Sequence, residues 1–142
     1  MSSLIGLVKK LFWTQVAFSR LETAIFDAVQ GQLSPKDAEL WGRQLKAVHK
    51  IYRSPDGRHV NWWVMRNGKS AFPQELCFTR TDEFKVAVVD LTAKQAKAKL
   101  RARVWCVNGH VFSIEYKTPF RVFEQAAQGE WEVSCHIVSH PS

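Results

Sequence analysis

The stretch that decides the fold runs from residue 96 to residue 116 and reads AKAKLRARVWCVNGHVFSIEY. The dipeptide Asn108-Gly109 lies between two runs rich in β-branched and aromatic residues. Both residues of a two-residue hairpin turn need a positive φ, which asparagine and glycine tolerate best. The stretch therefore predicts a β-hairpin with arms at residues 99–107 and 110–117.

A two-residue turn also fixes which residues face each other across the hairpin. The predicted facing pairs are Val107 with His110, Trp105 with Phe112, Arg103 with Ile114 and Arg101 with Tyr116. In the first arm, small and apolar residues alternate with cations and Trp105, so one face points inward. Strict alternation in the second arm places Glu115 on this inward face, where an unpaired carboxylate is costly unless the strand end reaches water.

Two helices are predicted before the hairpin. Residues 3–30 carry a helical apolar pattern that Ser3 caps and Gly31 ends. Ser34-Pro35 opens a second helix, whose apolar stripe continues to residue 52. The members of that stripe are Leu40, Trp41, Leu45, Val48 and Tyr52.

The remaining strands follow a turn at Ser54-Pro55-Asp56-Gly57. The predicted strands are residues 59–66, 84–91, 99–107, 110–117 and 131–138, and residues 120–127 form either a short helix or irregular structure. The sequence thus predicts one α+β domain over residues 1–142, with a helical hairpin at 3–52 and an antiparallel sheet at 58–138. Two N-terminal helices would pack on a curved meander of four to five strands. This outline is similar to the cystatin and nuclear-transport-factor cone folds, and an outline alone implies no function.

Composition indicates an ordinary globular protein: 46% of the 142 residues are hydrophobic and 23% are charged. Cys77, Cys106 and Cys135 are few, odd in number and set in apolar runs, which favours buried free thiols in a reducing, cytoplasmic compartment. No run approaches the roughly 18 apolar residues of a membrane span. The spacing of cysteines and histidines favours neither a metal site nor an activated nucleophile, and we expect no cofactor.

The net charge of +7 is unevenly distributed. Four cations in and just before the first hairpin arm lie near three aromatic residues on the predicted outward face, a combination that sheet surfaces use to bind single-stranded nucleic acid. These residues are Lys97, Lys99, Arg101, Arg103, Trp105, Phe112 and Tyr116. The alternative is a solvated strand face or a helix that covers the aromatic part.

The sequence favours a non-enzymatic protein–protein interaction module that binds a protein partner or a second copy of itself through an apolar and basic surface. Six tryptophans and surplus apolar surface support this hypothesis, because tryptophan and arginine concentrate at interface centres. The expected contact residues are Ile5, Phe12, Trp13 and Val16, which lie off the core face of the first helix. The alternatives are nucleic-acid binding and a ligand pocket or enzyme of the cone type, with Trp62, Trp63 and the histidines lining a cavity.

Overall fold

The computed structural model describes residues 17–142 and contains three α-helices, one short 3₁₀ helix and eight strands. The elements follow in chain order: α2 (Arg20–Gln30), α3 (Pro35–Lys46), β1 (Lys50–Arg53), β2 (His59–Trp63), β3 (Met65–Arg66), β4 (Lys69–Ser70), η1 (Gln74–Leu76), β5 (Phe84–Ala93), β6 (Lys99–Val107), β7 (His110–Tyr116), α4 (Phe120–Ala127) and β8 (Trp131–Ile137).

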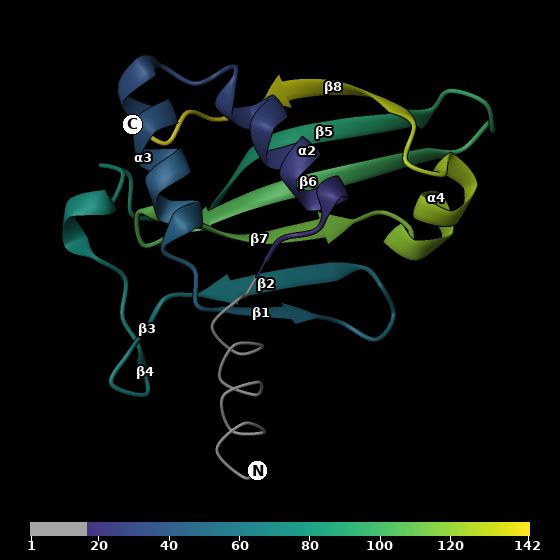
Figure 1. The fold of residues 1–142 in the computed structure, drawn as a ribbon. Coiled ribbons are helices and arrows are strands. Elements are labelled where there is room, and N and C mark those ends of the chain that lie inside the picture. The colour runs from purple at the N-terminus through teal and green to yellow at the C-terminus, as the bar shows by residue number, and fades with distance from the viewer. Residues whose placement is uncertain (1–16) are drawn as a thin grey trace, which may run out of the picture.

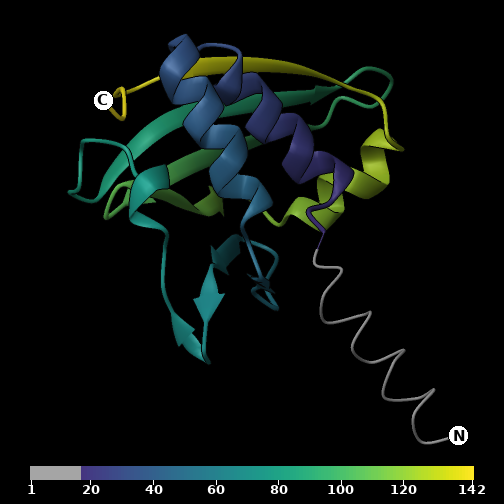
Figure 2. The ribbon, with the colours of Figure 1, turned by 60° about the vertical axis from the view of Figure 1, so that its left-hand side comes forward.

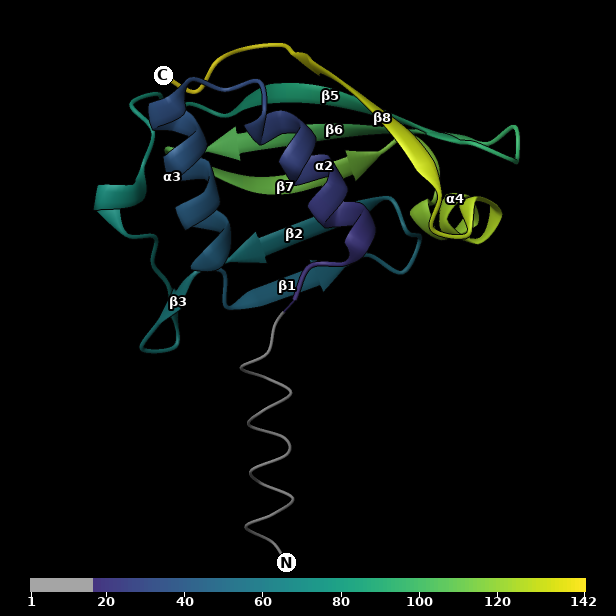
Figure 3. The same ribbon diagram turned by 45° about the horizontal axis from the view of Figure 1, so that its top comes forward.

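Six strands form one antiparallel sheet in the order β1-β2-β7-β6-β5-β8, and β3 pairs with β4 in a separate ribbon. Helices α2 and α3 lie across one face of the large sheet, and α4 packs against one end of it (Figures 1 and 2). The predicted α+β class and the two helices on an antiparallel sheet are confirmed. The sheet is no simple meander, since β8 returns to the far edge beside β5 (Figure 3).

The strands of the predicted hairpin agree closely with the structure, whereas the helical region differs. The expected continuous helix over residues 3–30 is wrong at its centre, because residues 17–19 are not helical and α2 begins at Arg20. The second helix ends at Lys46 instead of residue 52, and residues 50–53 form the edge strand β1, which was not predicted. The predicted end of the first helix at Gly31 and the predicted start of the second helix at Ser34-Pro35 are confirmed.

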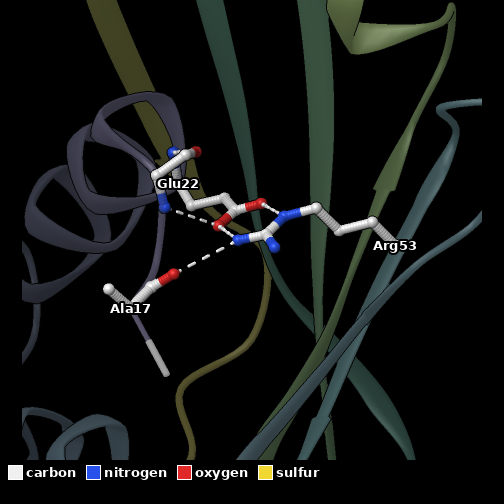
Figure 4. A network of polar contacts seen from close by, with 4 residues as sticks. Ala17, Glu22 and Arg53 are labelled. Atoms are coloured by element: carbon white, nitrogen blue, oxygen red, sulfur yellow. Dashed lines mark hydrogen bonds and ion pairs between the residues drawn. The ribbon is translucent and has the colours of Figure 1, made fainter. Parts of the chain in front are cut away.

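A capping box fixes the start of α2. The Ser19 hydroxyl accepts a hydrogen bond from the Glu22 amide, and the Glu22 carboxylate accepts one from the Ser19 amide at 2.8 Å. The same carboxylate receives two hydrogen bonds from Arg53 of β1, at 2.7 and 2.9 Å (Figure 4). Arg53 also reaches the Ala17 carbonyl oxygen at 3.4 Å. One buried carboxylate therefore joins the N-terminus of α2 to the edge of the sheet.

The core lies between the helices and the inner face of the sheet. Phe26 of α2 packs edge to face on Trp62 of β2, with ring centroids 5.2 Å apart. The indole N–H groups of the two buried tryptophans are satisfied, since Trp41 donates to the Phe26 carbonyl and Trp62 to the Val111 carbonyl. In the central strand β6, Leu100, Ala102, Val104 and Cys106 are buried, which confirms the predicted inward face of this arm.

A β-bulge changes the register of the hairpin after its first pairs. Val107 faces His110 as predicted, but Trp105 pairs with Ser113 and Arg103 with Glu115. The extra residue is Phe112, and every later side chain of β7 is turned to the opposite face from the one expected. Ile114 and Tyr116 therefore enter the core, and Glu115 leaves it.

The predicted turn has the expected geometry, with φ of 52° at Asn108 and 85° at Gly109. The turn is also packed: a Cβ atom added to Gly109 would lie 2.9 Å from the Cβ atom of Cys77. Gly68, at the tip of the β3–β4 ribbon, has a similar φ of 75° with nothing within 4 Å of such an atom. The two glycines separate the cost of backbone conformation from that of packing.

We predict that Gly68→Ala lowers the free energy of unfolding by about 1–2 kcal/mol, the cost of a positive φ in an L-residue. Gly109→Ala is expected to cost about 1–3 kcal/mol more, because its Cβ atom must displace Cys77. Urea denaturation of both variants measures the difference. Equal losses would show that the segment around Cys77 yields to the added methyl group.

A second prediction concerns the Glu22–Arg53 ion pair. The Glu22 side chain is 2% exposed and the Arg53 side chain is 33% exposed. Arg53→Met strands a buried carboxylate and is expected to cost about 3–5 kcal/mol of stability. Glu22→Gln keeps an acceptor for the Ser19 amide and leaves an arginine that can turn to water, so it should cost about 1–2 kcal/mol. Urea denaturation tests this order, and the reverse order would contradict it.

Candidate functional site

All three helices lie on the inner side of the sheet, so its opposite side carries no helix in residues 17–142 (Figures 1 and 3). We call this side the open face. It is formed by alternate side chains of the six strands: Lys50, Tyr52, His59, Asn61, Trp63, Lys85, Val88, Asp90, Thr92, Lys99, Arg101, Arg103, Trp105, Phe112, Ser113, Glu115, Glu132, Ser134 and His136. The alternation follows from the burial of the intervening residues beneath the helices.

One row of the open face crosses five strands. The strand register places Tyr52, Asn61, Ser113, Trp105 and Lys85 side by side in this order. The Ser113 hydroxyl donates a hydrogen bond to the Asn61 side-chain oxygen at 2.7 Å, which holds β2 and β7 together on this side. The row thus offers two partly exposed aromatic rings on a rigid strand platform.

The neighbouring positions are occupied by charged pairs. Arg103 lies 3.5 Å from the Glu115 carboxylate, and Arg101 binds Asp90 through two hydrogen bonds at 2.8 and 3.2 Å. The Asp90 carboxylate raises the pKa of the Arg101 guanidinium through these bonds. Two cations of the predicted basic stripe are therefore paired within the face itself.

The seven residues of the predicted nucleic-acid surface do not form one surface. Arg101, Arg103, Trp105 and Phe112 lie on the open face, and Lys99 lies at its end, whereas Lys97 is exposed in the β5–β6 loop. Tyr116, predicted on the outward face, is 2% exposed and belongs to the core. The bulge at Phe112 is the reason, since it turns Tyr116 inward.

The Tyr116 side chain lies in a buried environment near two carboxylates. Its ring packs on Phe120 with centroids 5.4 Å apart, and its hydroxyl oxygen has no hydrogen-bond partner among the described residues. Burial raises the pKa of the Tyr116 hydroxyl, and the nearby Glu22 and Glu124 carboxylates raise it further. The hydroxyl is therefore neutral and offers no charge to a ligand.

A groove of about 470 Å³ lies at the Lys99 end of the open face. Its polar lining comes from Asp90, Thr92, Lys99, Arg101, Lys117 and Thr118. The Trp62 and Trp63 indoles line no common cavity, because Trp62 is buried under α2 and its neighbour points to the open face.

The three cysteines are free, and only Cys106 is fully buried. Burial raises the pKa of the Cys77, Cys106 and Cys135 thiols, which disfavours the reactive thiolate. Cys106 faces Phe84 across the strands while Cys135 faces Val89, so the two thiols are not neighbours. Within residues 17–142, no three His, Cys, Asp or Glu side chains group as a metal site, and no helix is long and apolar enough to cross a membrane.

The expected contact residues Ile5, Phe12, Trp13 and Val16 lie outside the described residues. Four residues of the open face were not among the predicted site residues: Tyr52, Asn61, Lys85 and Val88. Tyr52 was missed because it matched a helical stripe, and the others because strand order cannot be read from a single strand.

The segment before β5 meets the β6–β7 turn at one end of the sheet. The Phe72 ring stacks on His110, with centroids 4.1 Å apart and an interplanar angle of 17°. The Phe78 amide donates to the Gly109 carbonyl, and the buried Gln44 amide group donates to the Leu76 and Gly109 carbonyls. Burial lowers the pKa of the His110 imidazole.

Comparison with protein-family models, with curated proteins and with solved structures finds no match for this chain.

The depressed pKa of His110 generates a prediction about pH. A histidine whose pKa is lower in the folded state contributes stability that is complete above its unfolded pKa of about 6.5 and is lost as the pH falls below it. Wild-type stability should therefore fall between pH 7.5 and pH 5. His110→Phe keeps the stacked ring and should remove this component. Urea midpoints of both proteins at the two pH values provide the measurement, and an equal fall in both would contradict the prediction.

Proposed function

We propose that the chain is a non-enzymatic protein-binding module that uses the open face as its contact surface. The observation that carries the proposal is the row in which Tyr52 and Trp105 stand partly exposed near paired arginines, on a side of the sheet that no helix of residues 17–142 covers. Tyr52 is 47% exposed. Aromatic residues and arginine are the groups that concentrate at the centres of protein interfaces.

The rigidity of the surface supports the same proposal. Trp105 belongs to β6, which is hydrogen-bonded to a strand on each side, so little backbone order remains to be gained on binding. A preformed surface avoids part of the entropic cost of association. The charged pairs around the row resemble the polar rim that surrounds an interface centre.

The charge distribution disfavours a polyanion as the ligand. A nucleic-acid surface needs cations that are free to replace counterions at the phosphates. Arg101 and Arg103 are already paired with Asp90 and Glu115, and Tyr116 is unavailable for base stacking. The open face also carries three lysines, Lys50, Lys85 and Lys99, that form no ion pair with any of residues 17–142. These lysines suit a protein partner with an apolar surface flanked by acidic side chains.

The raised pKa values of the three thiols support a role without covalent catalysis. We also propose a cytoplasmic location, because free thiols suit a reducing compartment.

The test compares the full wild-type chain with the double variant Tyr52→Ser, Trp105→Ser. Its matched control is Val122→Ser, which alters a side chain of α4 that is 65% exposed and lies outside the open face. A protein captured by the wild type is identified, purified and titrated against all three chains. We expect the double variant to bind at least tenfold more weakly, since truncating a central aromatic residue costs about 2 kcal/mol. The control should bind as the wild type does.

Titration with a single-stranded DNA oligonucleotide at two salt concentrations decides the alternative. Tight binding to the oligonucleotide with a steep loss of affinity at high salt would overturn the proposal. Equal binding of the captured protein to the double variant and to the wild type would overturn it as well.

A further inference from the structure

The far edge of the sheet is formed by β8, a strand of seven residues with only β5 beside it among the described strands. All seven residues pair with β5 in an unbroken register, from Ala87 opposite Ile137 to Ala93 opposite Trp131. Such an edge carries a row of backbone N–H and C=O groups that another strand can bind.

β8 lacks most of the devices by which sheets protect their edges, and its one charged carboxylate is that of Glu132. The strand reads WEVSCHI and contains no proline, no lysine and no arginine, and its pairing shows no bulge. The opposite edge strand β1 is different, because it is four residues long and contains Lys50 and Arg53. The two edge strands of the sheet therefore differ in length and in their content of basic residues.

Two backbone hydrogen bonds that flank β8 show which of its groups point outward. The Lys94 amide donates to the Glu130 carbonyl, and the Val138 amide donates to the Val86 carbonyl. In an antiparallel pair the bonded positions alternate, so the even-numbered residues of β8 bind β5. The N–H and C=O groups of Val133 and Cys135 consequently point to the free edge.

We infer that β8 binds β8 of a second copy of this chain, in antiparallel orientation about a two-fold axis at Ser134. This inference stands on the edge strand and is independent of the partner proposed for the open face. A two-fold axis at this position pairs Val133 with Cys135 of the second copy through two backbone hydrogen bonds. All seven residues of each strand then lie opposite a residue of the other.

Side-chain chemistry selects this register among the symmetric ones. It places Glu132 opposite His136 of the second copy, where the imidazole can donate a hydrogen bond to the carboxylate. A shift of the axis to Glu132 sets two like charges directly opposite each other. A shift to Val133 or Cys135 leaves Glu132 without a basic residue directly opposite and shortens the overlap. The strand is thus complementary to itself in one arrangement.

The loop between α2 and α3 contacts the edge without closing it. The Gln32 side chain donates a hydrogen bond to the Cys135 carbonyl at 2.7 Å, and this bond is solvent-exposed. A carbonyl oxygen has two lone pairs, so it can accept a second bond from an incoming strand.

The first experiment measures the mass of the full chain by light scattering over a dilution series. The wild type should show twice the chain mass of 16.3 kDa. Val133→Pro removes an N–H group that points away from β5, so it should leave the fold intact and return the mass to that of one chain. Val133→Thr keeps this N–H group and should remain a dimer. Circular dichroism of each variant monitors folding.

The second experiment tests the register by cross-linking and remains decisive if Val133→Pro fails to fold. In a Cys77→Ser, Cys135→Ser background, Ser134→Cys places two thiols at a non-hydrogen-bonded pair, where Cα atoms lie about 4.5 Å apart, within disulfide range. Mild oxidation should link most chains as dimers. Glu132→Cys alone in the same background should give no disulfide-linked dimer. Mixing this chain with a His136→Cys chain should restore cross-linking.

Three results would overturn the inference: a wild type that stays at the mass of one chain throughout the dilution series, a dimer that persists in folded Val133→Pro, or Ser134→Cys chains that do not cross-link. Binding of an extended peptide from another protein at β8 with no wild-type dimer would likewise assign the edge to that partner and reject the second copy.

Discussion

A buried carboxylate is tolerated only when its charge and its lone pairs are met, and Glu22 meets both requirements across two layers of the fold. Its oxygens accept hydrogen bonds from the Ser19 amide at the start of α2 and from the Arg53 guanidinium at the end of β1. Arg53 has a raised pKa chiefly because of this hydrogen-bonded carboxylate. The pair sets the position of α2 over the sheet and holds a four-residue strand that would otherwise be a weak edge. Among residues 17–142, the helices therefore lie on the side of the sheet to which this pair ties α2.

The position of Phe112 decides what the open face contains. Strict alternation from the Asn108-Gly109 turn would bury Glu115 and expose Ile114 and Tyr116. The bulge reverses this arrangement. One extra residue in β7 places the Glu115 carboxylate in solvent and buries the Ile114 and Tyr116 side chains in the core. The unfavourable burial of Glu115 was visible in the sequence as a conflict. A bulge was the solution, but its position depends on packing between strands that lie apart in the chain.

The sequence predicted the hairpin arms and the capped start of α3 because local chemistry determines them: positive φ at the turn and a hydroxyl before proline. It could not predict that residues 17–19 are not helical. Ser19 and Glu22 resemble ordinary polar positions within a helix, and their partner Arg53 belongs to another element. The strand β1 was hidden for a similar reason, because Tyr52 lies at helical spacing from Val48. Strand order across the sheet, and with it the rows of the open face, depends on contacts between distant segments.

The edge strand and the open face are related by geometry. Three even-numbered residues of β8 lie on the same side of the sheet as Trp105, namely Glu132, Ser134 and His136. Pairing of two β8 strands would therefore extend one open face into the other, with both aromatic rows on one continuous surface. A partner with two binding segments could then engage both copies, and the second contact would benefit from a high effective concentration. Dimerisation through the edge would strengthen binding at the face without any change in the face itself, which links the two surfaces in one assembly.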